Sequence, residues 1–232
     1  MTSRSLRAVI FDVDGTLYDT VRMRLAFAPW IAGQFARAPV ATVQALRVLR
    51  AYRRAHETLR GERHPDLEQA QRERTAFRLG LPVDRVGGIV STWFERAPIT
   101  AVGRAARPGL VEALQRLRTA GMRLAVVSDY PPQAKLDALG VAPLIDAVIW
   151  AQHPLVGALK PDPAGLLAAL RTLDVEAERA LYVGDRPEVD EAVALAAGCR
   201  AAVIGARAPL RSATPRFSDV SRLADWCLDG HG

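Results

Sequence analysis

The stretch "RAVIFDVD" (residues 7–14) is a short apolar run, rich in β-branched residues, that ends in aspartates. Four more runs of the same kind follow it, namely "RLAVVSD" (123–129), "DAVIWA" (146–151), "ALYVGD" (180–185) and "RAAVIG" (200–205). Near-continuous apolarity without alternation is typical of strands that are buried on both faces of a sheet. These runs therefore predict five buried strands.

Segments of helical period lie between the runs. In "GLVEALQRLRTAG" (109–121), leucines recur on one helical face and a glycine ends the segment. "PDPAGLLAALRTLD" (161–174) opens with prolines and an aspartate, which suit a helix start, and "PEVDEAVALAAG" (187–198) again ends on glycine. This alternation predicts a doubly wound, Rossmann-like α/β fold, in which helices cover both faces of a parallel sheet.

One long segment interrupts the alternation. Residues 20–103 contain helical periods but no strand-like run. Helix breakers divide the segment at Pro39, Gly61, Pro82 and Pro98. We therefore predict an α/β core domain formed by residues 1–19 and 104–232, with an all-helical cap domain inserted at residues 20–103.

Composition and charge restrict the class of protein only loosely. The chain has 232 residues, of which 50% are hydrophobic and 24% charged, and a net charge of +6 that favours anionic ligands in general. The two cysteines are too few for a disulfide scaffold. The apolar stretch near the N-terminus is too short for a signal peptide, and no stretch reaches the roughly 18 to 20 apolar residues of a membrane span. We expect a cytoplasmic protein with no membrane partner.

The segment "RVLRAYRRAHETLRGERH" (47–64) is strongly basic. Apolar residues such as Val48, Tyr52 and Leu59 recur along it, which indicates a helix with one solvated, charged face. No nucleic-acid-binding motif or series of stacking aromatics accompanies it. We therefore expect no nucleic acid partner, and a basic cap could instead attract phosphorylated substrates.

Polar residues follow several of the predicted strands. Open parallel sheets place their functional residues at the carboxyl ends of their strands. These ends carry Asp12 with Asp14, then Ser128 with Asp129, and then Asp185. They predict one site at this edge of the sheet.

Lysine is rare in this chain. Of the 31 basic residues, all but Lys135 and Lys160 are arginine. Lys160 lies in "GALKPDP" (157–163), just before the fourth predicted strand. A lysine among so many arginines indicates a position where a compact point charge meets one anionic oxygen and the planar guanidinium does not fit. Lys135 is assigned to an ordinary amphipathic helix and to no functional role.

Four short motifs resemble those of the haloacid dehalogenase (HAD) superfamily, in the order of that family. They are "DVDGT" (12–16), "VVSD" (126–129), "KPDP" (160–163) and "GDRPEVD" (184–190). The resemblance covers residues 7–19 and 104–205, and the helical insertion is similar in position to the family's cap. It points to the phosphatase branch with a helical cap, which includes phosphoglycolate phosphatases and β-phosphoglucomutase-like enzymes.

The resemblance implies a phosphoryl-transfer site. Asp12 would attack phosphorus and form an aspartyl-phosphate. Asp14 would protonate the leaving alkoxide and then activate water. Mg²⁺ would be held by the carboxylates of Asp12 and Asp185 and the backbone carbonyl of Asp14, and Asp190 would orient a metal-bound water or the lysine. Dehalogenases of the superfamily lack an acid at the position of Asp14, so its presence favours a phosphate ester as the substrate.

The remaining motif residues would bind the phosphoryl group. Ser128 would hydrogen-bond a phosphoryl oxygen, and Lys160 would neutralise the charge that grows on Asp12 and the phosphoryl group. Gly15 would permit the sharp exit from the strand, and Thr16 would help to hold the loop. Asp129 is placed beside the phosphate, although relatives often have asparagine there, and an acid at this position needs a cation such as Arg186 as its partner.

These features predict a Mg²⁺-dependent phosphatase that hydrolyses a small phosphorylated metabolite. The first alternative is a phosphomutase of the same superfamily, which would use the same four motifs. The second is a receiver-like or non-catalytic phospho-binding module, although receivers lack an acid two residues after the acceptor. Oligomeric state and substrate identity stay open.

Overall fold

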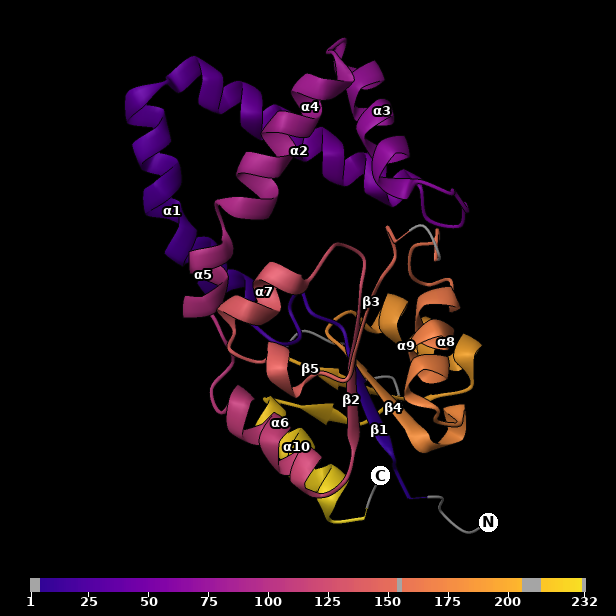
Figure 1. The fold of residues 1–232 in the computed structure, drawn as a ribbon. Coiled ribbons are helices and arrows are strands. Elements are labelled where there is room, and N and C mark those ends of the chain that lie inside the picture. Colours follow the sequence, from indigo (N-terminus) through magenta and orange to yellow (C-terminus); the bar gives the residue numbers. More distant parts are fainter. Residues whose placement is uncertain (1–4, 154–155, 206–213, 231–232) are drawn as a thin grey trace.

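The computed structural model describes residues 5–153, 156–205 and 214–230. Parts of the predicted core domain, residues 1–4, 154–155, 206–213 and 231–232, lie outside the described residues. The core domain occupies the lower part of Figure 1, and the helical insertion occupies the upper part. Among the described helices, none combines the length and the apolarity that crossing a membrane requires.

The core is built on one six-stranded sheet in which every neighbouring pair is parallel, in the order β3-β2-β1-β4-β5-β6. Its strands are β1 (Ala8–Phe11), β2 (Arg123–Ser128), β3 (Ala147–Trp150), β4 (Ala180–Gly184), β5 (Arg200–Ile204) and β6 (Arg216–Phe217). The five predicted strands are all present, and the predicted fold class is confirmed. The sixth strand, β6, is only two residues long, and no apolar run predicts it from the sequence.

Side chains of the central strands alternate between two apolar clusters, one on each face of the sheet. In β1, Val9 and Phe11 join one cluster, whereas Ala8 and Ile10 join the other. All four are fully buried. Burial on both faces explains why this strand has no polar alternation in the sequence.

Helices cover both faces of the sheet (Figure 1). Helices α6 (Leu110–Thr119) and α10 (Val220–Leu228) contribute to one cluster, and α8 (Ala164–Leu173) and α9 (Pro187–Ala197) contribute to the other. The predicted glycine stop of α9 is confirmed, because Gly198 has φ 77°, a left-handed conformation that suits glycine. Shorter helical turns complete the core, namely α7 (Gln133–Ala138), η2 (Ala142–Leu144) and η3 (Ala177–Arg179).

The described residues between β1 and α6 form helices and no strand, as predicted. These helices are α1 (Thr20–Arg37), α2 (Pro39–Thr58), α3 (Leu67–Leu79), α4 (Val83–Val90), the π-helix η1 (Ser91–Arg96) and α5 (Ile99–Arg104). Pro39 is the first residue of α2, and Pro82 and Pro98 directly precede α4 and α5. Proline is tolerated at helix starts, where its missing N–H costs no internal hydrogen bond.

The two chain segments that join the insertion to the core lie side by side. Tyr18 and Ala106 form an isolated antiparallel bridge. The backbone N–H of Asp19 donates to the carbonyl of Ala105 at 3.0 Å, and that of Arg107 donates to the carbonyl of Leu17 at 3.1 Å. The insertion therefore leaves and rejoins the core at one paired connection.

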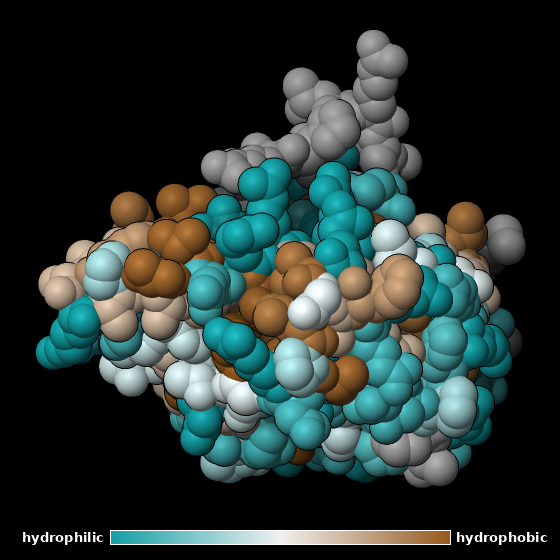
Figure 2. Space-filling model, turned by 90° about the horizontal axis from the view of Figure 1, so that it is seen from above, coloured by the Kyte–Doolittle hydropathy of each residue, from teal (hydrophilic) through white to brown (hydrophobic). Residues whose placement is uncertain are grey.

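The insertion has a small core of its own, in which Val48 and Tyr52 of α2 pack with Val86 and Val90 of α4. Tyr130, which follows β2, packs against this cluster from the α/β core. Helix α1 contains no buried residue. Apolar side chains of α1 and the start of α2 stay exposed, including Leu25 at 70% and Val40 at 71%, and Figure 2 shows apolar residues gathered on that side of the molecule.

Candidate active site

The predicted site residues follow neighbouring strands at one edge of the sheet. Strand β1 lies between β2 and β4, so Asp12, Ser128 and Asp185 extend from three adjacent positions. The backbone N–H of Asp12 still donates to the carbonyl of Val183 at 2.8 Å, which continues the sheet pairing into the site. The strand order thus brings together motifs that are far apart in the sequence.

Lys160 lies at the centre of a buried charge cluster. Its Nζ donates to Asp12 Oδ1 at 2.6 Å and to Asp190 Oδ1 at 3.0 Å, and it lies 3.3 Å from the Tyr182 hydroxyl. The side chain is 9% exposed. Burial alone would lower the pKa of Lys160, but the charges of Asp12 and Asp190 and the neighbouring Tyr182 together raise this pKa well above its ordinary value. The lysine is therefore fully protonated and bound to the predicted nucleophile.

Asp12 is held by Lys160 on one oxygen and by Thr16 on the other. The Thr16 hydroxyl donates to Asp12 Oδ2 at 3.1 Å. Burial raises the pKa of Asp12 to about 7 against the lowering effect of Lys160, and the charge of Asp190 adds to the rise. A further cation near Asp12 would stabilise its ionised form.

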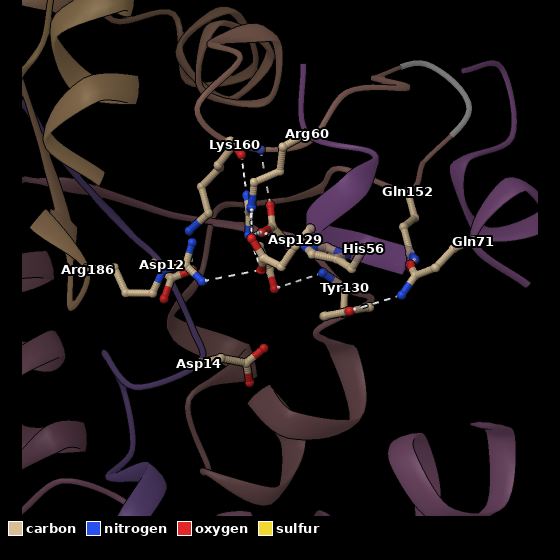
Figure 3. Close-up of polar contacts among 12 residues, drawn as sticks. Asp12, Asp14, His56, Arg60, Gln71, Asp129, Tyr130, Gln152, Lys160 and Arg186 are labelled. Carbon is tan, nitrogen blue, oxygen red and sulfur yellow. Dashed lines mark hydrogen bonds and ion pairs between the residues drawn. The ribbon is translucent and has the colours of Figure 1, made fainter. Parts of the chain in front are cut away.

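Asp14 is bound to the second lysine of the chain. Lys135 Nζ, from the first turn of α7, lies 2.6 and 2.7 Å from the two carboxylate oxygens of Asp14, and the Tyr18 hydroxyl also donates to this carboxylate. Burial would raise the pKa of Asp14, but the charge of Lys135 and the hydrogen bonds from Lys135 and Tyr18 together outweigh burial, and the pKa is lowered. Figure 3 shows Asp14 apart from the group around Asp12 and Lys160. The assignment of Lys135 to an ordinary helix face was wrong, because α7 begins shortly after β2 and its lysine is paired with Asp14.

Asp129 is enclosed by donors from both parts of the molecule (Figure 3). Its Oδ2 lies 3.1 Å from His56 Nε2 and 3.1 Å from Arg60 Nη2, both at the C-terminal end of α2 or just after it. Its Oδ1 accepts from the backbone N–H of Lys160 at 3.2 Å. Burial would raise the pKa of Asp129, but the hydrogen bond from His56 and the charge of Lys160 lower it.

The cationic partner that an acid at position 129 needs is thus supplied by the insertion. Arg186, the partner considered from the sequence, instead lies 3.9 Å from Glu57 and 3.8 Å from Glu188. His56 and Arg60 were missed because only the fold brings α2 against the end of β2. Arg60 also donates to the carbonyl of Lys160, so the insertion contacts the backbone of the lysine loop as well.

Ser128 and the neighbouring Tyr130 complete this side of the site. The Ser128 hydroxyl accepts from the backbone N–H of Tyr130 at 3.3 Å, which leaves its own proton to donate. The Tyr130 hydroxyl is contacted by Gln71 of α3 at 3.2 Å, and Gln152 donates to the same Gln71 at 2.9 Å (Figure 3). These contacts join the insertion to the loops after β2 and β3.

The loop that follows β1 is shaped by glycine and by an arginine. Gly15 has φ 94°, and a Cβ there would lie only 2.0 Å from Asp185 Oδ2. Only glycine therefore lets the Asp185 carboxylate lie against this loop. Arg107 donates to the carbonyls of Thr16 at 2.7 Å and Gly15 at 2.6 Å and fixes the loop backbone.

Asp190 accepts hydrogen bonds from Lys160 and from the backbone at the start of α9. Besides Lys160 Nζ, it accepts from the backbone N–H of Arg186 at 2.9 Å. A Cβ on Gly184 would lie 2.1 Å from Asp190 Oδ2, so a glycine at the end of β4 makes room for this carboxylate. Asp190 is thus placed to hold Lys160 in position.

The donor set suits a hard divalent cation. Within the described residues, Asp185 has no hydrogen bond and no ion pair. Burial and the charge of Asp190 raise its pKa to about 6. Carboxylates of raised pKa favour a cation that replaces the missing partner, and oxygen is the ligand that Mg²⁺ prefers. No group of three or more His, Cys, Asp or Glu side chains suited to a metal occurs in the described part of the chain. The predicted set comprises two carboxylates and a backbone carbonyl.

The fold and this site together define a class of enzymes. The chain matches the family model for haloacid dehalogenase-like hydrolases over residues 6–198, which is most of its length, so it belongs to this family. The predicted family, and with it the prediction of an enzyme, is confirmed.

Individual relatives within the family differ in activity. A phosphoglycolate phosphatase of Rhodospirillum rubrum is 39% identical over 139 residues, which is 56% of this chain and 56% of that relative. A solved HAD phosphatase from Thermococcus onnurineus matches 97% of this chain and 99% of its own, with a TM-score of 0.65 and 22% identity. An L-2-haloacid dehalogenase from Xanthobacter autotrophicus, with chloropropionic acid covalently bound, matches 98% of this chain and 100% of its own, with a TM-score of 0.66 and 19% identity.

The two solved structures show the fold alone. A phosphatase and a dehalogenase resemble this chain about equally, so the fold does not choose between the two reactions. The choice depends on the residues of the site.

Proposed function

We propose that this protein is a Mg²⁺-dependent phosphatase that hydrolyses a small phosphorylated metabolite through an aspartyl-phosphate. The observation that carries the proposal is the buried pair of Asp12 and Lys160, 2.6 Å apart, next to the second carboxylate, Asp14. A nucleophile and a fixed cation can serve either reaction, but an acid two residues later is required only for a phosphate ester, whose leaving alkoxide has to be protonated.

In the first step, an Asp12 oxygen attacks phosphorus and the bond from phosphorus to the leaving oxygen breaks. Lys160 offsets the negative charge that accumulates on Asp12 and the phosphoryl oxygens. Ser128 donates its hydroxyl proton to one of those oxygens. Asp14, in its protonated form, transfers a proton to the leaving alkoxide.

In the second step, Asp14 removes a proton from water, and the water oxygen attacks the phosphorus of the aspartyl-phosphate. Inorganic phosphate leaves and Asp12 is restored. The contact of Asp14 with Lys135 and Tyr18 favours the ionised form, which is the form that the second step requires. In the first step the lysine contact would have to loosen so that Asp14 carries a proton.

Mg²⁺ would be held by the carboxylates of Asp12 and Asp185 and the carbonyl of Asp14, and it would offset the repulsion between the substrate phosphate and these acids. Asp190 would act on Lys160 from behind. Residues 20–103 would act as a cap that excludes bulk water from the reacting atoms. We place the protein in the cytoplasm, which fits its two free cysteines, Cys199 and Cys227.

Phosphoglycolate is the first substrate to test, because the Rhodospirillum rubrum relative is named for its hydrolysis. The experiment measures phosphate release from p-nitrophenyl phosphate, phosphoglycolate and a panel of phosphorylated metabolites, with Mg²⁺ and with EDTA. Asp12→Asn should abolish release, whereas Asp84→Asn, the same change at an exposed position of α4, should not. Release that survives Asp12→Asn or EDTA would contradict the proposal.

Absence of release from folded, Mg²⁺-supplied protein would also have a definite meaning. Conversion of one sugar phosphate into another would then identify a phosphomutase. A stable phospho-aspartate without turnover would identify a phospho-binding module.

A further inference from the structure

Helix α2 turns one face toward the active site. His56 of this face and Arg60, just beyond the helix, contact Asp129. Arg53 precedes Arg60 by seven residues, which returns to nearly the same face of a helix about 10 Å further along its axis. Arg53 therefore belongs to the face of α2 that packs on the core. It lies further along the helix axis than His56 and Arg60, and so further from Asp129.

The charge of Arg53 acts on the Tyr18 hydroxyl, which lies on the Asp14 side of the site. Burial and the Asp14 carboxylate raise the pKa of Tyr18, and the positive charge of Arg53 opposes them. The Tyr18 hydroxyl is the group that donates to Asp14. Arg53 is thus near enough to act electrostatically on the hydroxyl beside the proposed acid.

The Arg53 guanidinium rests on an aromatic surface. Its central carbon lies 5.6 Å from the centre of the Phe94 ring. Phe94 in turn meets Tyr130, the residue after Asp129, edge to face at 4.8 Å. A cation held over an aromatic ring keeps its N–H groups available for another partner.

The other cations of the site already have partners. Lys160 is bound to Asp12, Lys135 to Asp14, and Arg107 to the carbonyls of the β1 loop. Arg60 is shared between Glu57 and Asp129. Arg53 is exposed, and within the described parts of the chain its guanidinium makes no hydrogen bond and no ion pair.

We propose that Arg53 binds a carboxylate carried by the leaving group, so that the preferred substrates are phosphate esters of small hydroxy acids. This inference rests on the proposed function, because it assumes that the leaving group lies on the Asp14 side. A guanidinium offers two parallel N–H donors that match the two oxygens of a carboxylate. A leaving group without a negative charge would gain nothing from Arg53.

The test compares two substrates of similar size, phosphoglycolate and 2-hydroxyethyl phosphate, in which a hydroxymethyl group replaces the carboxylate. Arg53→Met should lower kcat/KM for phosphoglycolate by about 10- to 100-fold, the range for a lost hydrogen bond to a charged group. The same variant should change kcat/KM for 2-hydroxyethyl phosphate by less than about twofold. Equal losses on both substrates, or no loss on either, would overturn the proposal.

Two further variants control for charge and geometry. Arg54→Met removes the same charge from the next position of α2, which is also exposed, and should affect neither substrate. Arg53→Lys retains the charge but not the paired donors, and should restore only part of the activity on phosphoglycolate. If Arg54→Met lowered kcat/KM on phosphoglycolate as much as Arg53→Met does, the effect would depend on net charge alone and the proposal would be overturned.

A binding measurement separates failure of this inference from failure of the proposed function. Calorimetry with the Asp12→Asn protein gives the Kd of both compounds without turnover. If the wild-type protein releases no phosphate while the Asp12→Asn protein binds phosphoglycolate in an Arg53-dependent way, the inference is retained and the phosphatase is rejected. Absence of an Arg53 effect on this Kd would overturn the inference even if the phosphatase is confirmed.

Discussion

The Lys160 cluster and the Asp129 cluster are both buried groups of charges, but they belong to different parts of the molecule. Lys160 pairs with Asp12 and Asp190, which all lie in the α/β core. Asp129 pairs with His56 and Arg60, which come from the insertion. The first cluster can persist while the insertion moves, whereas the second exists only when the insertion is docked.

This difference separates two tasks that a capped enzyme has to perform. The core by itself holds Asp12, the proposed nucleophile, against Lys160. The Asp129 cluster instead ties the insertion to the core through one acid, beside the contacts of Gln71 with Tyr130 and Gln152. Changes to the first cluster should therefore act on the chemical step, and changes to the second should act on cap docking.

The largest effect is expected for Lys160→Arg. The guanidinium is too broad for the buried space between Asp12, Asp190 and Tyr182, so kcat should fall by about 100- to 1,000-fold although the charge is kept. Steady-state kinetics of Lys160→Arg beside Lys160→Met provide the measurement, and thermal unfolding of both variants checks that they are folded. A rate for Lys160→Arg close to that of the wild type would show that the core cluster tolerates a different cation geometry.

A smaller effect is expected at the boundary, from Asp129→Asn and Arg60→Met. Asparagine can still accept from the Lys160 N–H through its amide oxygen, but its amide NH2 group cannot accept from Arg60 or His56, so kcat/KM should fall by about tenfold. The double variant should lose about as much kcat/KM as either single variant, because the two residues share one interaction. The coupling free energy between the two changes should be about 0.5–3 kcal/mol. Additive losses would mean that the pair does not hold the insertion in place.

Lys135→Met tests the second carboxylate of the core. Loss of this cation removes the charge that lowers the pKa of Asp14, so that pKa should rise. The acid limb of the kcat profile, where Asp14 must be ionised to act as a base, should move to higher pH, with kcat on that limb falling about tenfold. Lys135→Arg, which keeps the charge, should leave the limb in place, and a shift of the same size in both variants would contradict this account.

The smallest effect is expected on thermal stability. The folded-state pKa values of Asp12 and Asp185, about 7 and about 6, lie above the ordinary value of 3.8, so their contribution to stability is present at acid pH and is lost as pH rises through these values. The Tm of the metal-free protein should fall by a few degrees between about pH 4 and 7, because each kcal/mol lost from the free energy of unfolding lowers Tm by about 2–4 °C.

Added Mg²⁺ should reverse this loss, because it stabilises the ionised carboxylates, and its effect on Tm should be larger near pH 7 than near pH 5. Asp185→Asn should reduce both the fall of Tm with pH and the rise of Tm on adding Mg²⁺, whereas Asp84→Asn should leave both unchanged. A Tm of the metal-free protein that rises over the same interval would contradict the proposed metal site.

The fold could be predicted almost entirely from local patterns. Strands buried on both faces have continuous apolar runs, and Pro39, Pro82 and Pro98 stand at helix starts, so the strands and several helix limits were readable along the chain. Pro29, inside α1, marks no such limit. The exception, β6, pairs through two residues, and so short a strand is decided by its neighbour β5 and not by its own sequence.

The site was predictable where its residues stand at strand ends, as Asp12, Ser128 and Asp185 do. His56 and Arg60 were not predictable, because they meet Asp129 only through packing of α2 on the core, about 70 residues away in the sequence. Lys135 is a different case. The scarcity of lysine that indicated Lys160 applied equally to Lys135, and its position just after the second motif strand was a second signal.

The paired connection between Leu17–Asp19 and Ala105–Arg107 has an architectural consequence. Antiparallel segments of this kind are ends that a tight turn of a few residues can join. The chain of the insertion leaves and rejoins the core at a single junction, beside the contacts of His56, Arg60 and Gln71 with the core, and we infer that it is an exchangeable module. A lineage or an engineer could shorten it, lengthen it or replace it with another helical unit, and the strand ends that carry the acids would keep their order.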